Sequence, residues 1–372
     1  MADLNSHPRS KVTWLTNLPA PYRLGIWNRF QKFHDLSVWY LLSERNWRHW
    51  SIDKVPEWQY SFLNKKSLRI GELDLVVSAL GNKKVLKDTD VLIVGGWDSP
   101  FFIQVMRNAK KKDIPIILFY ESTLQSHRFN GRLIRAIRYK IFSLADHVVT
   151  AGAASTAAVI DMGIDPKKIL TLFNPVDVSW FAEFAASHRV EASTGHRFLY
   201  VGQLIDRKNV DALIDAFAAM RQENDLLTIV GDGTRGSDLK KQVMELGLEH
   251  AICFTGHHDQ EQVAEDYAAA ETLVLPSTNE VWGLVVNEAL ASGLHVVVSS
   301  AAGVSAFVAS MKGAYVCEPT DVDLALALTQ SRTDWQGPIT NPEIVEYTPE
   351  RFADAVLECA NVILESGKER KE

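Results

Sequence analysis

Short apolar runs rich in β-branched residues alternate with stretches of helical length along almost the whole chain. Twelve runs predict strands: 11–18, 36–42, 91–96, 114–121, 147–152, 169–174, 197–204, 226–233, 251–257, 272–277, 295–300 and 313–319. Segments between them, such as 210–220 and 239–248, repeat apolar residues every three or four positions, as amphipathic helices do. This alternation predicts parallel sheets with helices on both faces.

The chain is long enough for two domains, since 372 residues exceed what one ordinary core holds. A polar stretch at 183–197 separates two sets of six strands. We therefore expect an α/β protein of two Rossmann-like, doubly wound parallel-sheet domains facing a cleft, at residues 1–185 and 190–345. A last helix at 349–366 follows no strand, and the segment 346–372 is expected to pack back toward the N-terminal domain.

The composition is that of a soluble globular protein, with 47% hydrophobic and 23% charged residues. No apolar run approaches the ~20 residues of a membrane-spanning helix, and no apolar stretch of a secretory signal precedes the first strand. Cys253, Cys317 and Cys359 are widely spaced and form no metal-ligand pattern. A reducing cytoplasm is therefore the expected compartment.

Charge is distributed unevenly between the two halves. Residues 1–190 contain 26 Lys and Arg against 17 Asp and Glu, whereas residues 191–372 contain 13 against 29. The basic half is expected to meet something anionic, such as nucleic acid, a membrane surface or a phosphorylated acceptor. Nucleic acid is not favoured, because interleaved aromatic and basic runs and any known binding module are missing from the sequence.

Residues 128–147 predict a basic amphipathic helix within this half. Its apolar stripe is formed by Leu133, Ile134, Ile137, Ile141 and Phe142, and packing in the core explains such a stripe most simply. Its basic residues are Arg128, Arg132, Arg135, Arg138 and Lys140. They suggest peripheral contact with an anionic membrane or with a lipid-diphosphate acceptor.

The segment PSTNEVWGLVVNEALASG, residues 276–293, carries the clearest chemistry. A strand ends, a short loop follows, and a helix starts near Gly283. The backbone N–H groups of Gly283, Leu284 and Val285 are then unpaired at the positive end of the helix dipole. This predicts an anion site suited to a diphosphate.

Two glutamates flank this helix start. Glu280 lies in the loop before the helix, and Glu288 lies eight residues further on. An isolated pair of this kind is most often solvated. Beside a diphosphate, however, Glu280 could accept hydrogen bonds from sugar hydroxyls and Glu288 from a ribose, because ionised carboxylates are acceptors only.

The same segment resembles the donor-binding signature of family-4 glycosyltransferases of the GT-B fold: Glu, seven residues, Glu, with an aromatic residue and Gly after the first. Further segments match in order and spacing: 173–181, 200–217, 227–233, 251–257 and 299–304. The resemblance is strong over residues 145–330 and weak before them, where it rests mainly on 17–23.

This resemblance implies a retaining hexosyltransferase that moves a sugar from a nucleoside-diphosphate sugar to a hydroxyl acceptor. UDP is favoured over GDP, and the nucleotide sugar is a substrate, so no cofactor and no metal is expected. The acceptor would be a glycan, a lipid-linked molecule or a small molecule, in cell-surface polysaccharide or glycolipid biosynthesis. The reaction would take place in the cytoplasm, at the inner face of the membrane where the acceptor is lipid-linked.

The resemblance also assigns catalytic residues. Arg207 and Lys208 would contact the diphosphate and neutralise the leaving group, with Glu280 on the sugar. Many family members have a further Arg where this chain has Gln203. That departure keeps open the alternative of a catalytically inactive nucleotide-sugar-binding protein.

Glycines on the donor side raise a second alternative. Residues 231–236 form G-x-G-x-x-G after a strand, as in nicotinamide dehydrogenases, but the next strand ends in Gly256-His257 instead of the acidic residue that binds the ribose. In the glycosyltransferase interpretation, Gly231 and Gly233 let the chain approach the nucleoside, and Gly202 is placed beside them.

The N-terminal half departs further from the family. Where the family has a glycine-rich first loop, this chain has Pro19–Arg23, which contains no glycine. Where the family has a His after the middle strand, this strand ends at Glu121. The residues left as candidates for contact with the acceptor or the transferred sugar are Arg23, Asp98, Glu121 and His127.

Overall fold

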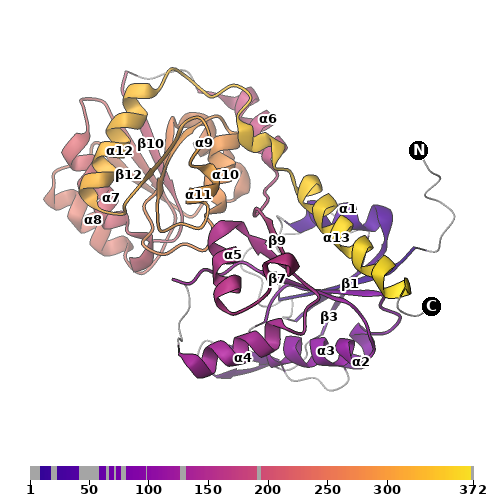
Figure 1. The fold of residues 1–372 in the computed structure, drawn as a ribbon. Coiled ribbons are helices and arrows are strands. Elements are labelled where there is room, and N and C mark those ends of the chain that lie inside the picture. Colours follow the sequence, from indigo (N-terminus) through magenta and orange to yellow (C-terminus); the bar gives the residue numbers. More distant parts are fainter. Residues whose placement is uncertain are drawn as a thin grey trace.

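The computed structural model describes residues 9–17, 23–41, 58–63, 67–70, 73–76, 81–97, 99–125, 131–190 and 194–369. Within them the chain forms two parallel sheets with helices packed on both faces (Figure 1). All twelve predicted strands are present, within a few residues of their expected bounds. The predicted fold class is therefore confirmed.

The first sheet has seven strands in the order β3-β2-β1-β6-β7-β8-β9, and every neighbouring pair is parallel. The strands are β1 (Lys11–Thr16), β2 (Asp35–Tyr40), β3 (Gln59–Phe62), β6 (Val91–Val94), β7 (Ile116–Tyr120), β8 (His147–Ala151) and β9 (Ile169–Leu172). The order runs outward from β1 in one direction and from β6 in the other, which makes the sheet doubly wound.

Successive side chains of each strand point to opposite faces of this sheet, and each face packs into a different apolar core. In β1, Val12 and Trp14 belong to the cluster that contains helix α1 (Leu24–Phe33), whereas Leu15 belongs to the opposite cluster. Four helices contribute to that opposite cluster: α2 (Gly81–Val85), α3 (Pro100–Lys110), α4 (Arg132–Phe142) and α5 (Gly152–Asp161), which follows β8.

The second sheet has six strands in the order β12-β11-β10-β13-β14-β15, also parallel. They are β10 (Arg197–Val201), β11 (Leu226–Val230), β12 (Ile252–Gly256), β13 (Thr272–Leu275), β14 (His295–Ser299) and β15 (Ala314–Cys317). The central strands β13 and β14 are buried along their whole length, as continuous apolar runs between two helical layers must be.

Helices again cover both faces of the second sheet. One layer contains α7 (Val210–Met220), α8 (Gly236–Glu245) and α12 (Asp321–Asp334). The other contains α9 (Gln260–Ala269) and α10 (Leu284–Ala291). Shorter or connecting helices are η3 (Pro166–Lys168), α6 (Val178–His188), η4 (Asp206–Lys208), α11 (Ser305–Val308) and η5 (Glu343–Glu346).

Three short strands were not predicted. One is β3, and the others are β4 (Ser67–Ile70) and β5 (Leu73–Val76), which form an antiparallel pair outside both main sheets. Each has only four residues. Runs this short do not establish a period of two, so the pattern did not distinguish them from loops.

Helix α4 corrects the prediction for residues 128–147. It begins at Arg132 and ends at Phe142, and residues 126–130 lie outside the described part of the chain. Leu133 and Ile137 are 73% and 47% exposed, so the expectation that they pack in the core is wrong. Arg138 is buried instead, with its guanidinium 5.6 Å from the centre of the Trp97 ring. Its long apolar stem fills a position on the buried side of the helix.

The last helix, α13 (Pro349–Glu369), lies against α1 (Figure 1). Arg29 of α1 donates two hydrogen bonds to the Asp354 carboxylate, at 2.7 and 3.0 Å. The Phe352 ring lies 5.8 Å from the ring of Phe119 in β7 and 5.8 Å from that of Phe173. The C-terminal segment therefore returns to the first sheet after the second sheet is complete.

Phe173 joins the two sheets through aromatic contacts. It follows β9, and its ring stacks on Phe307 of α11 with ring centroids 6.0 Å apart and an interplanar angle of 15°. Tyr347, just before α13, meets the same ring edge-on at 5.1 Å. One apolar cluster therefore runs from the first sheet through Phe173 into the second.

Truncating Phe352 tests this packing. We expect Phe352→Ala to lower the free energy of unfolding by about 3–5 kcal/mol, because a buried aromatic ring is replaced by a cavity. Val362→Ala, on the exposed side of the same helix, should change it by no more than about 0.5 kcal/mol. Urea unfolding of both variants gives the two values, and equal effects would contradict the docking of α13.

Candidate functional site

The carboxyl ends of the two sheets face each other at α10. The Trp282 indole lies against Gly152 at the end of β8, where an added Cβ would be 2.8 Å from the ring. The Asn287 amide donates a hydrogen bond to the carbonyl oxygen of Asn174 after β9 (3.0 Å) and accepts one from the indole N–H of Trp282 (3.3 Å). Trp282 and Asn287 are buried. They hold the segment 276–293 against the first domain.

The start of α10 has the geometry predicted for an anion site. Gly283 adopts φ 105°, which favours glycine, and an added Cβ would lie 2.5 Å from a methyl group of Leu275. Among the described residues, no protein acceptor receives a hydrogen bond from the backbone N–H of Leu284 or Val285. These two groups and the helix dipole therefore remain available to an anion.

Lys208, Arg207 and Glu280 converge beside this helix start. The Lys208 ammonium donates a hydrogen bond to the Glu280 carboxylate, and the Arg207 guanidinium lies 3.4 Å from the same carboxylate. The Lys208 and Glu280 side chains are each only 13% exposed, whereas Arg207 is 46% exposed. Lys208 ends η4 after β10, and Glu280 follows the neighbouring strand β13, so adjacent strand ends bring the three together.

Glu288 is half-buried on α10 and accepts a hydrogen bond from the Tyr267 hydroxyl of α9 (2.8 Å). Burial raises the pKa of the Glu288 carboxyl to about 7, although the bond from Tyr267 favours the ionised form. Burial also raises the pKa of Tyr267, so this hydroxyl keeps its proton and donates. Nothing in the sequence of α9 distinguishes Tyr267 from an ordinary core residue, and the sequence analysis missed it.

The glycines of the G-x-G-x-x-G segment are required by contacts within the protein. An added Cβ on Gly231 would lie 1.9 Å from the carbonyl oxygen of Gly202, and one on Gly233 would lie 2.2 Å from that of Leu204. Hydrogen bonds such as that from the Leu204 N–H to the Asp232 carbonyl oxygen (2.9 Å) hold the two loops together. This packing accounts for the pattern without a bound nucleotide.

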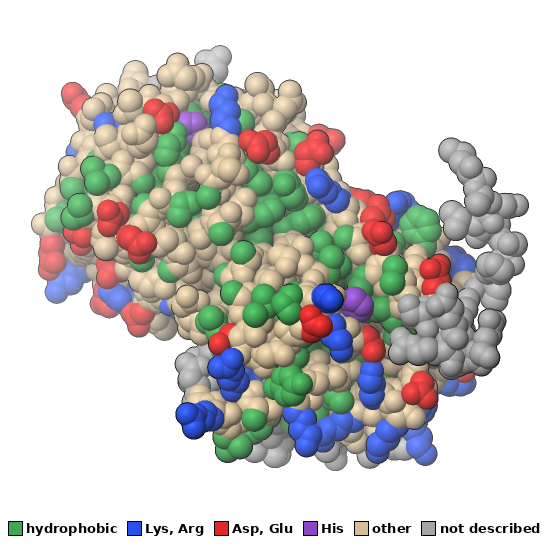
Figure 2. Space-filling model, in the orientation of Figure 1, with side chains coloured by type: hydrophobic (Ala, Val, Ile, Leu, Met, Phe, Trp, Pro, Cys, Tyr) green, Lys and Arg blue, Asp and Glu red, His purple; other side chains and the backbone are tan. Residues whose placement is uncertain are grey.

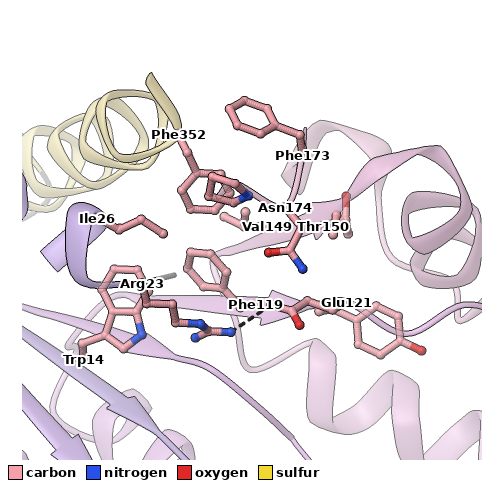
Figure 3. A pocket seen from close by; sticks show the side chains of 13 residues that line it. Trp14, Arg23, Ile26, Phe119, Glu121, Val149, Thr150, Phe173, Asn174 and Phe352 are labelled. Carbon is pink, nitrogen blue, oxygen red and sulfur yellow. Dashed lines mark hydrogen bonds and ion pairs between the residues drawn. The ribbon is translucent and has the colours of Figure 1, made fainter. Parts of the chain in front are cut away.

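At the end of the first sheet, the Arg23 guanidinium donates a hydrogen bond to the Glu121 carboxylate at 2.8 Å (Figure 3). Arg23 is buried, and the pair borders a small pocket that is otherwise largely apolar and aromatic. Asn174 also lines the pocket. The structure thus brings together two of the four acceptor-side candidates, whereas Asp98 and His127 lie outside the described residues.

Within the described ranges, no group of three or more His, Cys, Asp or Glu side chains is arranged to hold a metal ion. None of the helices in that part of the chain combines the length and apolar character needed to cross a membrane.

Two family profiles match this chain. The family described as "Glycosyltransferase Family 4" matches residues 43–180, and "Glycosyl transferases group 1" matches residues 184–335. Glycogen synthase of Mycobacterium tuberculosis is 27% identical over 232 residues, or 60% of this chain and 55% of that protein. O-antigen chain mannosyltransferase B of Escherichia coli is 28% identical over 209 residues, or 55% and 49%. The chain spans about half the length of the curated relatives it matches.

Solved structures match over nearly the full chain. HepE of Anabaena in complex with UDP gives a TM-score of 0.68 at 17% identity, covering 97% of this chain and 99% of that one. The lipopolysaccharide outer core galactosyltransferase WaaB in its apo form gives 0.66 at 17% identity, covering 96% and 98%. The fold is therefore GT-B, and the chain belongs to the family-4 glycosyltransferases.

The raised pKa of Glu288 predicts a pH dependence of stability. The carboxyl titrates near 4.5 in the unfolded chain and near 7 in the folded protein, so the folded state binds this proton more tightly. Its contribution to stability is complete below the unfolded pKa and is lost as the pH rises through the folded pKa. The neutral variant Glu288→Gln removes this dependence.

Urea unfolding at about pH 5 and about pH 8 checks the direction. We expect wild type to lose stability relative to Glu288→Gln between the two pH values, whereas Glu245→Gln, an exposed control, should follow wild type. A constant difference between wild type and Glu288→Gln would contradict the assignment.

Proposed function

We propose that this protein is a retaining hexosyltransferase that moves a sugar from a nucleoside-diphosphate sugar to a hydroxyl acceptor. The observation that carries the proposal is the convergence of Lys208, Arg207 and Glu280 beside the free N–H groups at the start of α10. Two cations, one carboxylate and a helix N-terminus together suit a ligand that joins a diphosphate to a polyhydroxylated ring.

Donor binding is proposed to exchange the partners of Lys208. Without a ligand, the Glu280 carboxylate neutralises the mostly buried ammonium group of Lys208. A diphosphate placed on the N–H groups of Leu284 and Val285 offers Lys208 and Arg207 acceptors of higher charge. The Glu280 carboxylate is then released to accept hydrogen bonds from the hydroxyls of the sugar.

The chemical step is proposed to depend on positioning and electrostatics. As the bond from the sugar to the phosphate breaks, negative charge builds on the leaving diphosphate, where Lys208 and Arg207 stabilise it. The leaving phosphate itself takes the proton of the acceptor hydroxyl, so no side-chain base is needed. Retention of the anomeric configuration and independence from a metal follow from the family resemblance.

The other end of the donor is proposed to lie along α10, with the ribose on the Glu288 carboxylate. UDP is favoured as the nucleotide, and HepE, which shares the fold, binds UDP. The acceptor hydroxyl is proposed to approach from the first sheet, where the Arg23–Glu121 pair borders a pocket. Named relatives such as an O-antigen chain mannosyltransferase support a role in cell-surface polysaccharide or glycolipid biosynthesis in the cytoplasm.

Two substitutions separate the proposed roles. Glu280→Ala should reduce turnover by about 10–150-fold, the loss of one charged hydrogen bond in the transition state, with no loss of nucleoside diphosphate affinity. Lys208→Ala should weaken diphosphate binding and reduce kcat by at least about 10², because its contact strengthens as the leaving group forms. Nucleotide-sugar hydrolysis and calorimetric titration measure the two effects.

The exposed ion pair of Lys241 and Glu245 on α8 (3.6 Å) supplies matched controls, since Lys241→Ala and Glu245→Ala remove the same charges away from the site. Both should retain wild-type kinetics. If wild type binds the donor but never hydrolyses or transfers the sugar, the protein is an inactive nucleotide-sugar-binding protein and the proposal is wrong. A rise in KM with unchanged kcat in Lys208→Ala would reject the leaving-group role alone.

A further inference from the structure

Three helices on one face of the first sheet contain no acidic residue. Helices α2, α3 and α4 together contain eight Lys and Arg and no Asp or Glu. By contrast, α7 and α9 of the second sheet contain five Asp and Glu and no Lys or Arg. The three basic helices contribute to a single apolar cluster and therefore lie on the same side of the sheet; their outer sides are called the basic face below.

The outer side of α4 adds apolar side chains to the basic face. Leu133 and Ile137 are one helical turn apart and exposed. Lys140 is exposed on the same side of the helix, and Arg132 is exposed in the first turn of α4, next to Leu133 in the sequence. Aliphatic side chains that protrude between cations are unfavourable in water and are typical of helices that lie in a membrane interface.

A shallow groove continues the basic face from α4 toward α3. It is lined by Pro100, Ile103, Gln104, Arg107, Asn108, Lys111 and Leu144. Figure 2 shows Lys and Arg side chains gathered along the lower edge of the molecule, over these helices, with hydrophobic side chains among them. Acidic side chains are more frequent on the domain opposite.

Two basic side chains of α4 are already engaged within the protein. Arg135 lies 3.4 Å from the Asp161 carboxylate, and Arg138 is buried beside Trp97. Exposed cations that could reach a flat surface therefore include Arg132 and Lys140 on α4, Arg107 on α3 and Lys111 just after α3.

We propose that the basic face docks on an anionic lipid bilayer, with α4 lying in the plane of the interface and Leu133 and Ile137 inserted among the acyl chains. Anionic headgroups complement the cations, and the hydrocarbon boundary takes the aliphatic side chains, which a nucleic acid would leave in water. The proposal concerns a surface away from the paired carboxyl ends of the sheets, so it stands whether or not the protein transfers sugars.

Co-sedimentation with vesicles tests the proposal. The purified full chain should bind phosphatidylcholine vesicles that contain phosphatidylglycerol and should not bind vesicles of phosphatidylcholine alone. Binding should weaken between about 0.1 M and about 1 M salt, because the Debye length falls from about 10 to about 3 Å. Each cation near the surface contributes roughly fivefold to the partition coefficient.

Two pairs of substitutions separate the charged from the apolar contribution. Arg132→Gln with Lys140→Gln should reduce the partition coefficient roughly 30-fold and flatten its salt dependence. Leu133→Ser with Ile137→Ser should reduce it at least about tenfold and leave the salt dependence in place. All four side chains are exposed, so the melting temperature should not change.

The second domain supplies matched controls. Val322 and Leu326 on α12 are also one turn apart and are 63% and 65% exposed, but Asp321 and Asp323 lie beside them. Val322→Ser with Leu326→Ser, and Lys240→Gln with Lys241→Gln on α8, should bind vesicles like wild type.

Three results would overturn the proposal. The first is that wild type fails to bind anionic vesicles at low salt. The second is that the control pairs lose as much binding as the α4 pairs. The third is that wild type without lipid forms a dimer that the Leu133 and Ile137 substitutions dissociate, in which case the face binds a second copy of the chain.

Discussion

The arrangement of the site depends on one buried contact between the two domains. Trp282 and Asn287 flank the start of α10, and both reach across to the first domain, where they meet Gly152 and the Asn174 carbonyl group. Because an unpaired buried amide or indole N–H is costly, these contacts fix the position of α10 relative to the first sheet. The free N–H groups at the helix start and the Glu280 carboxylate therefore face the ends of both sheets.

The charged side chains beside α10 share one constraint, because each must avoid an unpaired buried charge. Lys208 and Glu280 are mostly buried and neutralise each other, so the unliganded site avoids an unpaired buried charge. Glu288 avoids the same cost differently, through a raised pKa and a hydrogen bond from Tyr267.

The sequence was sufficient for the parts of the molecule that follow from local rules. Apolar runs predicted the main strands, and the family resemblance implied that Lys208 and Glu280 act on one ligand; the structure shows the two side chains in contact. What the sequence did not reveal depends on packing between distant elements. The Tyr267 hydroxyl meets Glu288 only after α9 and α10 pack together. Arg138 is buried where Ile137 is exposed, which shows the side of α4 that meets the sheet, and a helical repeat alone does not determine that side. Asn287 did carry a usable signal, because a polar residue on the apolar side of a helix needs a buried partner.

The central claim is that the paired cations at α10 bind the second phosphate of a nucleotide. Calorimetry with a nucleoside diphosphate and the matching monophosphate, on wild type and on Lys208→Ala, tests it most directly. The account predicts that wild type binds the diphosphate at least about tenfold more tightly, the size of one charge-assisted hydrogen bond, and that Lys208→Ala removes most of this preference. Equal affinity of wild type for the two nucleotides, or a preference that survives in Lys208→Ala, would contradict it.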